Sequence, residues 1–415
     1  MKRSFFIAVF AGGALVLGLF GAEITVPHLE LASRGSVEDG DFGIRTSAEA
    51  DISLQGGYKY GIILGLGAEI PNLQKALSYG RIELPYGSTP GPTGDEYNAL
   101  VEEVNERFNN QATLSIRSVE ASVRDLFGGP LEAGFFIGHY DKLGSGEDFQ
   151  DLFGSLPVTT GLRGFLYYPE GLGGDPSLRF NGSVHSIMGT GIALRGMFRE
   201  KLVPSLYIYH DLSFLDETTG AYLPGHYSGD FRLLANSAAV KFEFFTGLTY
   251  VNHDNPVIRG GVLAFFDAGT LALLMQAGVP YWEATEDFDI NNWYFLLEPR
   301  IRAGQIGSTL TFFYHPVYYM NRIIRDKNGD PEQGRADLNF KIFYGDINHS
   351  AFEGGLEATL GLKMYNGEDI NLWVSPFVQI AGAGLLWNFK LRFNALYFNE
   401  GGDFAEGFIG IRTAY

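Results

Sequence analysis

The sequence contains no cysteine in its 415 residues, which excludes both a disulfide framework and an anchor through a lipid-modified cysteine. Long apolar runs are also missing, because after residue 22 no stretch reaches the roughly 18 apolar residues that a transmembrane helix needs. Acidic residues outnumber basic ones by 48 to 30, and the net charge is −18. Such a charge argues against nucleic acid as a partner, since the phosphate backbone repels an acidic protein.

The N-terminus has the three parts of a secretory signal. A basic start, "MKR", precedes the apolar run "SFFIAVFAGGALVLGLF", and small residues follow up to Ala22. A membrane anchor is disfavoured because polar, strand-like sequence follows at once. We therefore predict a signal peptide over residues 1–22 and a mature chain over residues 23–415.

The composition of the mature chain predicts an all-β protein. Aromatic residues make up 14% of the sequence, with 34 Phe and 22 Tyr, and 55 Gly recur throughout. These residue types favour strands and turns over long helices. The chain is too long for one ordinary sandwich, so it forms either several domains or one large closed sheet.

Strand after strand alternates between an apolar and a polar face. In residues 44–55, "IRTSAEADISLQ", Ile44 and Ile52 fall on one face while Arg45 and Glu49 fall on the other. A soluble sandwich shows the same alternation, but these strands run about 10 to 14 residues, the length that crosses a bilayer at a tilt. The pattern predicts a transmembrane antiparallel β-barrel of about 18 strands, with roughly 16 to 20 possible.

The connections are alternately short and long, as a barrel with both termini in the periplasm requires. Two of the long ones stand out, residues 71–112 and 143–186. The predicted long connections lie at 33–42, 71–112, 143–186, 215–226 and 321–335. We expect these to be outer loops.

The C-terminus, "GFIGIRTAY", keeps the alternation of a strand to the last residue, with Ile409, Ile411, Thr413 and Tyr415 on one face. This ending resembles the C-terminal sorting strand of bacterial outer-membrane β-barrels, which ends on an aromatic residue, most often Phe. The hairpin "SVEASVRDLFGGPLEAGFFIGHY" also loosely resembles one in porins. The resemblance implies location in the outer membrane of a diderm bacterium, contact with outer-membrane lipid, and recognition by the barrel-assembly machinery. It implies a sorting signal made of Phe408, Ile411 and Tyr415.

The polar faces of the predicted strands carry more basic than acidic side chains, although the whole chain is acidic. One interpretation is a water-filled pore with an anion-favouring constriction. The other is a set of cross-strand charge ladders that only hold a polar interior together. The predicted pore-lining residues are Arg45, Glu49, Arg195, Arg199, Lys241, Glu243, Glu298, Arg300, Arg302, Lys390 and Arg392.

Both long loops contain apolar sequence. A capping box of Thr93 and Glu96 opens a predicted helix in the 71–112 loop, which either lids the pore or packs on the barrel rim. In the 143–186 loop, "SGEDFQDLF" begins with a possible helix cap, and "LRGFLYY" is too apolar for a solvated loop. That loop folds inward as a constriction or hides one more hairpin.

The sequence shows no convincing metal or cofactor site. In "DKNGDPEQGRAD", Pro331 stands where the sharp turn of a calcium loop requires glycine. We therefore interpret this segment as a polar loop and predict no bound metal or cofactor. The residues with calcium-loop spacing are Asp326, Asn328, Asp330 and Asp337.

The sequence also lacks a catalytic motif. The pair His185 and Ser186, in "SVHS", is the one Ser–His adjacency that could supply a base and a nucleophile. Adjacent residues on a strand point to opposite faces, so the pair is not arranged for catalysis. We therefore predict that the protein is not an enzyme.

The sequence thus predicts a porin-type channel for passive diffusion of small hydrophilic solutes, with a mild preference for anions. One alternative is a fatty-acid-type transporter of hydrophobic compounds. Another is a surface adhesin or structural barrel with a closed pore. The oligomeric state stays open.

Overall fold

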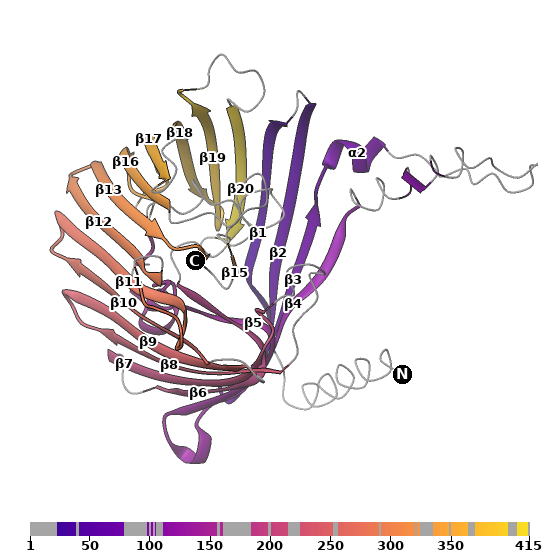
Figure 1. Cartoon of the computed structure of the whole chain (residues 1–415), viewed down its shortest axis with the longest axis vertical. Coiled ribbons are helices and arrows are strands. Elements are labelled where there is room, and N and C mark those ends of the chain that lie inside the picture. Colours follow the sequence, from indigo (N-terminus) through magenta and orange to yellow (C-terminus); the bar gives the residue numbers. More distant parts are fainter. Residues whose placement is uncertain are drawn as a thin grey trace, which may run out of the picture.

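The computed structural model describes most of the chain after the predicted signal peptide. The described residues are 23–38, 41–78, 98, 101–102, 104, 111–155, 158–160, 184–197, 201–214, 225–251, 256–289, 292–319, 322–323, 335–347, 350–363, 370–396 and 405–413. They form a ring of strands around a lumen (Figure 1).

Eighteen long strands build the ring, and their alternating sequence explains why. The first nine are β1 (Glu23–Glu38), β2 (Asp41–Gly56), β3 (Tyr60–Ile70), β4 (Thr113–Val123), β5 (Leu131–Leu143), β6 (His185–Gly196), β7 (Leu202–Asp211), β8 (His226–Asn236) and β9 (Val240–Val251). The others are β10 (Val257–Asp267), β11 (Leu271–Glu283), β12 (Tyr294–Ala303), β13 (Ile306–His315), β16 (Arg335–Gly345), β17 (Phe352–Lys363), β18 (Asn371–Gly382), β19 (Leu385–Asn394) and β20 (Ala405–Thr413).

Short elements lie in the connections. They are the helices α2 (Leu73–Ser78) and α4 (Asp148–Phe153), the 3-10 turn η1 (Leu126–Gly128), and a small hairpin of β14 (Tyr318–Tyr319) and β15 (Arg322–Ile323). The small hairpin was not predicted. Most of the predicted helix after Thr93 lies outside the described residues. In the described part of the chain, no helix has the length and hydropathy to span a membrane.

Each long strand pairs antiparallel with the next along the chain, and β20 pairs with β1 to close the ring. Closure matters because an open sheet edge in lipid would leave backbone amides without partners. The predicted all-β barrel and its count of 18 strands are confirmed.

The predicted long connection at 33–42 is wrong. β1 and β2 continue through it in register, with Val37 opposite Phe42 and Glu38 opposite Asp41. Glycine and charged residues there suggested a loop. However, Arg34 and Ser36 are buried on the inner face of the barrel, which accepts polar side chains that a soluble core would exclude.

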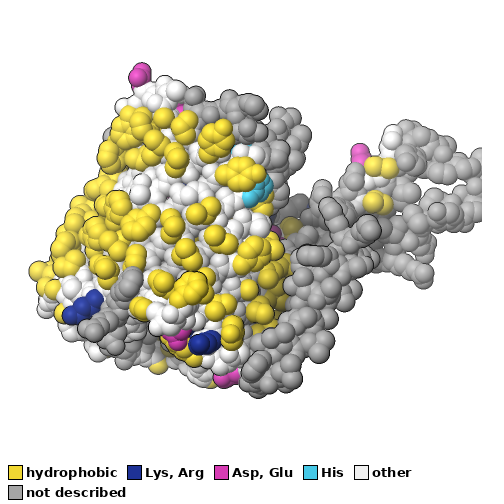
Figure 2. Space-filling view, turned by 90° about the horizontal axis from the view of Figure 1, so that it is seen from below, with side chains coloured by type: hydrophobic (Ala, Val, Ile, Leu, Met, Phe, Trp, Pro, Cys, Tyr) yellow, Lys and Arg dark blue, Asp and Glu magenta, His cyan; other side chains and the backbone are white. Residues whose placement is uncertain are grey.

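The two faces of the wall differ as the alternation requires. Hydrophobic side chains cover much of the outer face seen in Figure 2, with the few charged ones near its ends. Outward residues such as Ile208, Tyr227 and Leu248 are about half exposed, while their neighbours along each strand are buried. A barrel with an apolar exterior and a polar interior is suited to a bilayer.

Candidate functional site in the barrel lumen

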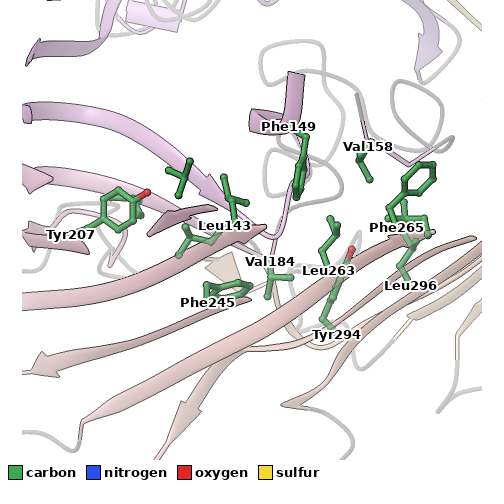
Figure 3. Packing of buried hydrophobic residues seen from close by; sticks show 14 of the residues in the cluster. Leu143, Phe149, Val158, Val184, Tyr207, Phe245, Leu263, Phe265, Tyr294 and Leu296 are labelled. Carbon is green, nitrogen blue, oxygen red and sulfur yellow. The ribbon is translucent and has the colours of Figure 1, made fainter. Parts of the chain in front are cut away.

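A loop folds into the lumen after β5. Its described residues, 144–155 and 158–160, include α4 and are called the inward loop from here on. Phe149 and Val158 of this loop are fully buried in one cluster with Leu263, Leu296 and other inward residues of β9 to β13. Figure 3 shows both side chains pointing toward these strands. The loop therefore has its own apolar core against one half of the wall.

Arg232 of β8 attaches the inward loop to that wall. Its side chain is only 1% exposed. Its Nε donates to Glu243 Oε1 at 2.7 Å, its Nη1 donates to Asp141 Oδ1 at 2.9 Å, and the same Nη1 donates to Asp148 of α4. Arg195 approaches the same Asp141 at 3.6 Å. One buried guanidinium thus bridges three carboxylates, and charge-assisted hydrogen bonds of this kind are among the strongest in proteins.

The third carboxylate in this cluster is electrostatically unfavourable. Burial removes water from Asp148, and the charge of Asp141 repels it, so its pKa rises to about 6 despite the attraction of Arg232 and Arg195. Charge on Asp148 therefore opposes docking of α4 on balance.

Two further contacts fix the start of the inward loop. The backbone amide of Gly144 donates to Glu243 Oε1 at 2.7 Å, and Gln276 Nε2 of β11 donates to the Gly144 carbonyl at 2.8 Å. Tyr294 of β12 donates in turn to the amide oxygen of Gln276. The backbone polar groups of the turn after β5 are thus satisfied by the wall, as burial requires.

The far side of the inward loop is held by β12 and β13. Thr160 donates to Glu298 Oε2 at 2.8 Å, and Thr311 donates to the same oxygen at 2.6 Å. Arg300 pairs with Glu298 at 2.7 Å and donates to the Thr159 carbonyl. Arg300 is therefore part of the loop attachment as well as of the lumen wall.

The opposite half of the wall carries cations beside aromatic rings. Lys341 pairs with Glu353 at 2.9 Å and lies 4.6 Å from the ring centre of Phe377. Arg392 stacks on Trp373 at 3.8 Å and pairs with Glu406 at 3.4 Å. Each of these two cations therefore lies against an aromatic ring.

The structure places the described pore-lining candidates on the inner face, but in two different settings. Glu243, Glu298 and Arg300 take part in the attachment of the inward loop. Arg302 pairs with Asp346 at 2.6 Å, and Glu49 pairs with Arg117. Arg45, Arg195, Lys241, Lys390 and Arg392 also lie on inward faces, and Arg199 lies outside the described residues. Arg300 and Arg302 of β12 thus lie on a different part of the wall from Lys390 and Arg392 of β19.

Several inward charged residues were missed by sequence reasoning. Arg232 shares a face with Asp230, and Arg259 of β10 binds Asp230 at 2.6 Å. The alternation in "HYSGDFRLL" could have identified both β8 residues. Asp141 could not be found this way, because the pairing of β5 shifts register between His139 and Asp141 and reverses the phase. Asp148 could not be identified either, because it enters the lumen only through the folding of the inward loop.

The remaining predicted positions have simple placements. Phe408 faces the lumen and is 6% exposed, whereas Ile411 faces outward, and Tyr415 lies outside the described residues. Asp326, Asn328 and Asp330 also lie outside them, while Asp337 is buried on β16. Within the part that the structure describes, no group of three or more His, Cys, Asp or Glu could hold a metal ion.

No protein-family model matches the sequence, and no curated protein matches it. Solved structures do match the fold. OccAB4 of Acinetobacter baumannii aligns with a TM-score of 0.53 at 12% identity, covering 94% of this chain and 97% of that one. OccAB2 of the same organism gives 0.50 at 12% identity, covering 95% and 98%. OccK3 of Pseudomonas aeruginosa gives 0.50 at 10% identity, covering 94% and 95%.

At these identities the likeness concerns the fold and not the substrate. It extends over nearly the whole chain. The protein is therefore a closed antiparallel β-barrel of 18 strands, with a fold similar to those of OccAB4, OccAB2 and OccK3.

Proposed function

We propose that this protein is a porin-type channel of the outer membrane of a diderm bacterium, which passes small hydrophilic solutes by diffusion with a mild preference for anions. The observation that carries this proposal is the division of the lumen wall into two halves. The inward loop packs with an apolar core against β9 to β13, while β16 and β19 carry Lys341 and Arg392 on the inner face. A charged inner wall favours polar solutes, and its basic residues favour anions.

The preference is expected to be mild because acidic partners accompany the cations. Glu353 pairs with Lys341, and Glu406 pairs with Arg392. The wall therefore attracts anions without presenting an uncompensated basic ring. No catalytic role is proposed, and recognition of the C-terminal strand by the barrel-assembly machinery belongs to the same proposal.

Conductance across planar bilayers tests the function. We expect an ohmic channel whose reversal potential in a salt gradient has the sign of anion preference. Replacing Lys341 and Arg392 by Glu is expected to shift that potential toward cations. Lys59→Glu is the matched control for each single replacement, since it makes the same change of two charge units in the exposed β2–β3 turn. A silent bilayer would favour a closed structural barrel, and an unchanged reversal potential would place the selectivity elsewhere.

A further inference from the structure

The seam between β4 and β5 closes only part of the wall. Pairing runs from Val123 opposite Ala133 to Ser118 opposite Gly138, and there it stops. Both strands continue for five residues, but β4 pairs only with β3 and β5 only with β6. At every other seam of the described barrel, pairing continues to within one residue of the end of at least one strand. In Figure 1, β4 rises beside β3 while β5 runs toward β6.

Local geometry explains why the strands separate at this point. Gly138 has a φ of +89°, and a side chain there would overlap the carbonyl oxygen of Arg117. Beyond it, β5 turns inward, and the Tyr140 ring stacks on Phe136 at 4.4 Å. Asp141 lies in this outer end of β5, and Arg232 of β8 donates a hydrogen bond to its carboxylate at 2.9 Å. β5 is thus attached to the half of the wall that carries the inward loop.

The outer end of β4 is attached to the other side. Arg117 pairs with Glu49 of β2, and Ser115 donates to the Gly67 carbonyl of β3 at 3.3 Å. The two strands are therefore held apart from both sides of the seam. We call the resulting space, bounded by Thr113–Arg117 and His139–Leu143, the β4–β5 notch.

The notch lies within the part of the wall that faces lipid. The paired part of the seam, six residue pairs long, rises roughly 14 Å at a 45° tilt, against an apolar band of about 25 Å. Leu114 and Ile116 beside it are 80% and 56% exposed. Beyond Ser118, β4 pairs with β3 and not with β5, and a sheet edge that borders hydrocarbon favours a neighbouring group that can form hydrogen bonds. A molecule that hydrogen-bonds at one end and is apolar at the other matches both features.

We propose that the lumen opens sideways into the outer leaflet through the β4–β5 notch, and that the opening admits amphipathic molecules with a polar head and a single apolar chain. The head hydrogen-bonds to the edge of β4, and the chain lies against Leu114 and Ile116. Diffusion of hydrophilic solutes along the barrel axis does not need this opening, so the inference goes beyond the proposed function.

Quenching of tryptophan by brominated lipid tests the opening. Tyr140→Trp places an indole on the lumenal side of the notch. Phe313→Trp places one inside β13, at a residue that is paired with Leu296 of β12 and with Asp337 of β16. Each variant is folded into phosphatidylcholine vesicles with or without bromine on the acyl chains, and the quenching of the parent chain is subtracted. We expect loss of emission from Tyr140→Trp that Phe313→Trp does not show. If Tyr140→Trp is quenched no more than Phe313→Trp, a strand of this chain or of a second copy seals the notch, and the proposal is overturned.

A covalent staple gives a second measurement on the same site. The sequence has no cysteine, so Ile116→Cys and His139→Cys are the only targets of a bis-maleimide linker. Stapling the Tyr140→Trp protein is expected to remove its quenching by brominated lipid and by a bromine-labelled fatty acid. Quenching that survives the staple would also overturn the proposal. Ohmic conductance should persist in the stapled protein, so failure of the lateral opening and failure of the channel function are distinguishable.

Discussion

Replacing Asp148 by Asn should make the inward loop dock more tightly at neutral pH, although it removes one partner of Arg232. The reason is that Asp141 and Glu243 already bind this guanidinium within the barrel, and Asp148 adds a third carboxylate. Desolvation and repulsion from Asp141 outweigh the attraction of Arg232 and Arg195, as the raised pKa of Asp148 indicates. An uncharged amide of the same shape avoids both costs.

The magnitude follows from linkage. The pKa of Asp148 is about 6 in the docked loop, against 3.8 for an ordinary aspartate. The docked state therefore holds the proton more tightly, so docking is strongest below pH 3.8 and weakens as pH rises through about 6. Between pH 8 and pH 5 the ratio of docked to undocked loop should rise about tenfold, or ~1.4 kcal/mol. In Asp148→Asn this contribution is absent, and docking at pH 8 should resemble that of the protonated wild type.

Single-channel recording at the two pH values measures the effect, because an undocked loop widens the lumen and raises conductance. Wild type should spend more time at the larger conductance at pH 8 than at pH 5, and Asp148→Asn should lose most of this difference. Glu147→Gln is the matched control, since Glu147 pairs with Lys142 at 2.7 Å and is not a partner of Arg232. If Asp148→Asn instead undocks more often at pH 8, attraction to Arg232 dominates and the reasoning is refuted.

Four further outcomes are expected. Arg232→Met leaves buried carboxylates without their cation and should destabilise the folded barrel by about 3–5 kcal/mol, seen as a lower unfolding temperature on unboiled gels; an unchanged temperature would contradict the bridging role. Phe149→Ala should cost about 3–5 kcal/mol in loop packing and lengthen the high-conductance periods, and steady recordings would argue against an apolar loop core. Gly146→Ala should also lengthen the high-conductance periods, because Gly146 has a φ of +70° and the alanine Cβ would overlap the Val158 carbonyl. A variant whose loop stays docked would contradict this expectation. Deleting residues 408–415 should abolish insertion into the outer membrane, since closure needs β20, and normal insertion would contradict the sorting interpretation.

The barrel could be predicted because its rule is local. Alternation of apolar and polar residues at a period of two sets the face of each side chain, and strand length and turn spacing set the count. The same rule placed Glu243, Glu298 and Arg300 on the inner face. It failed at residues 33–42, because loop signals drawn from soluble proteins do not apply to a wall with a polar inner face.

The contacts of the inward loop could not be predicted, because they join residues far apart in the chain. Glu243 meets the Gly144 amide across 99 positions, and Glu298 meets Thr160 across 138. Sequence reasoning treated Arg300 as a pore charge, whereas it also donates to the Thr159 carbonyl. The bulge in β5 adds a second obstacle, since a single shift of phase moves Asp141 to the opposite face from that expected.

The apolar core under the inward loop has a consequence for the order of assembly. All its strands lie in one continuous segment, residues 131–315, so its contacts form without either terminus. Closure of the ring is different, because the Arg34–Glu406 pair at the β1–β20 seam joins positions 372 residues apart. Bringing such distant segments together has a larger entropic cost of loop closure than forming the nearer contacts does. We therefore expect folding to begin in residues 131–315, which pack against the inward loop, and the β1–β20 seam to pair last.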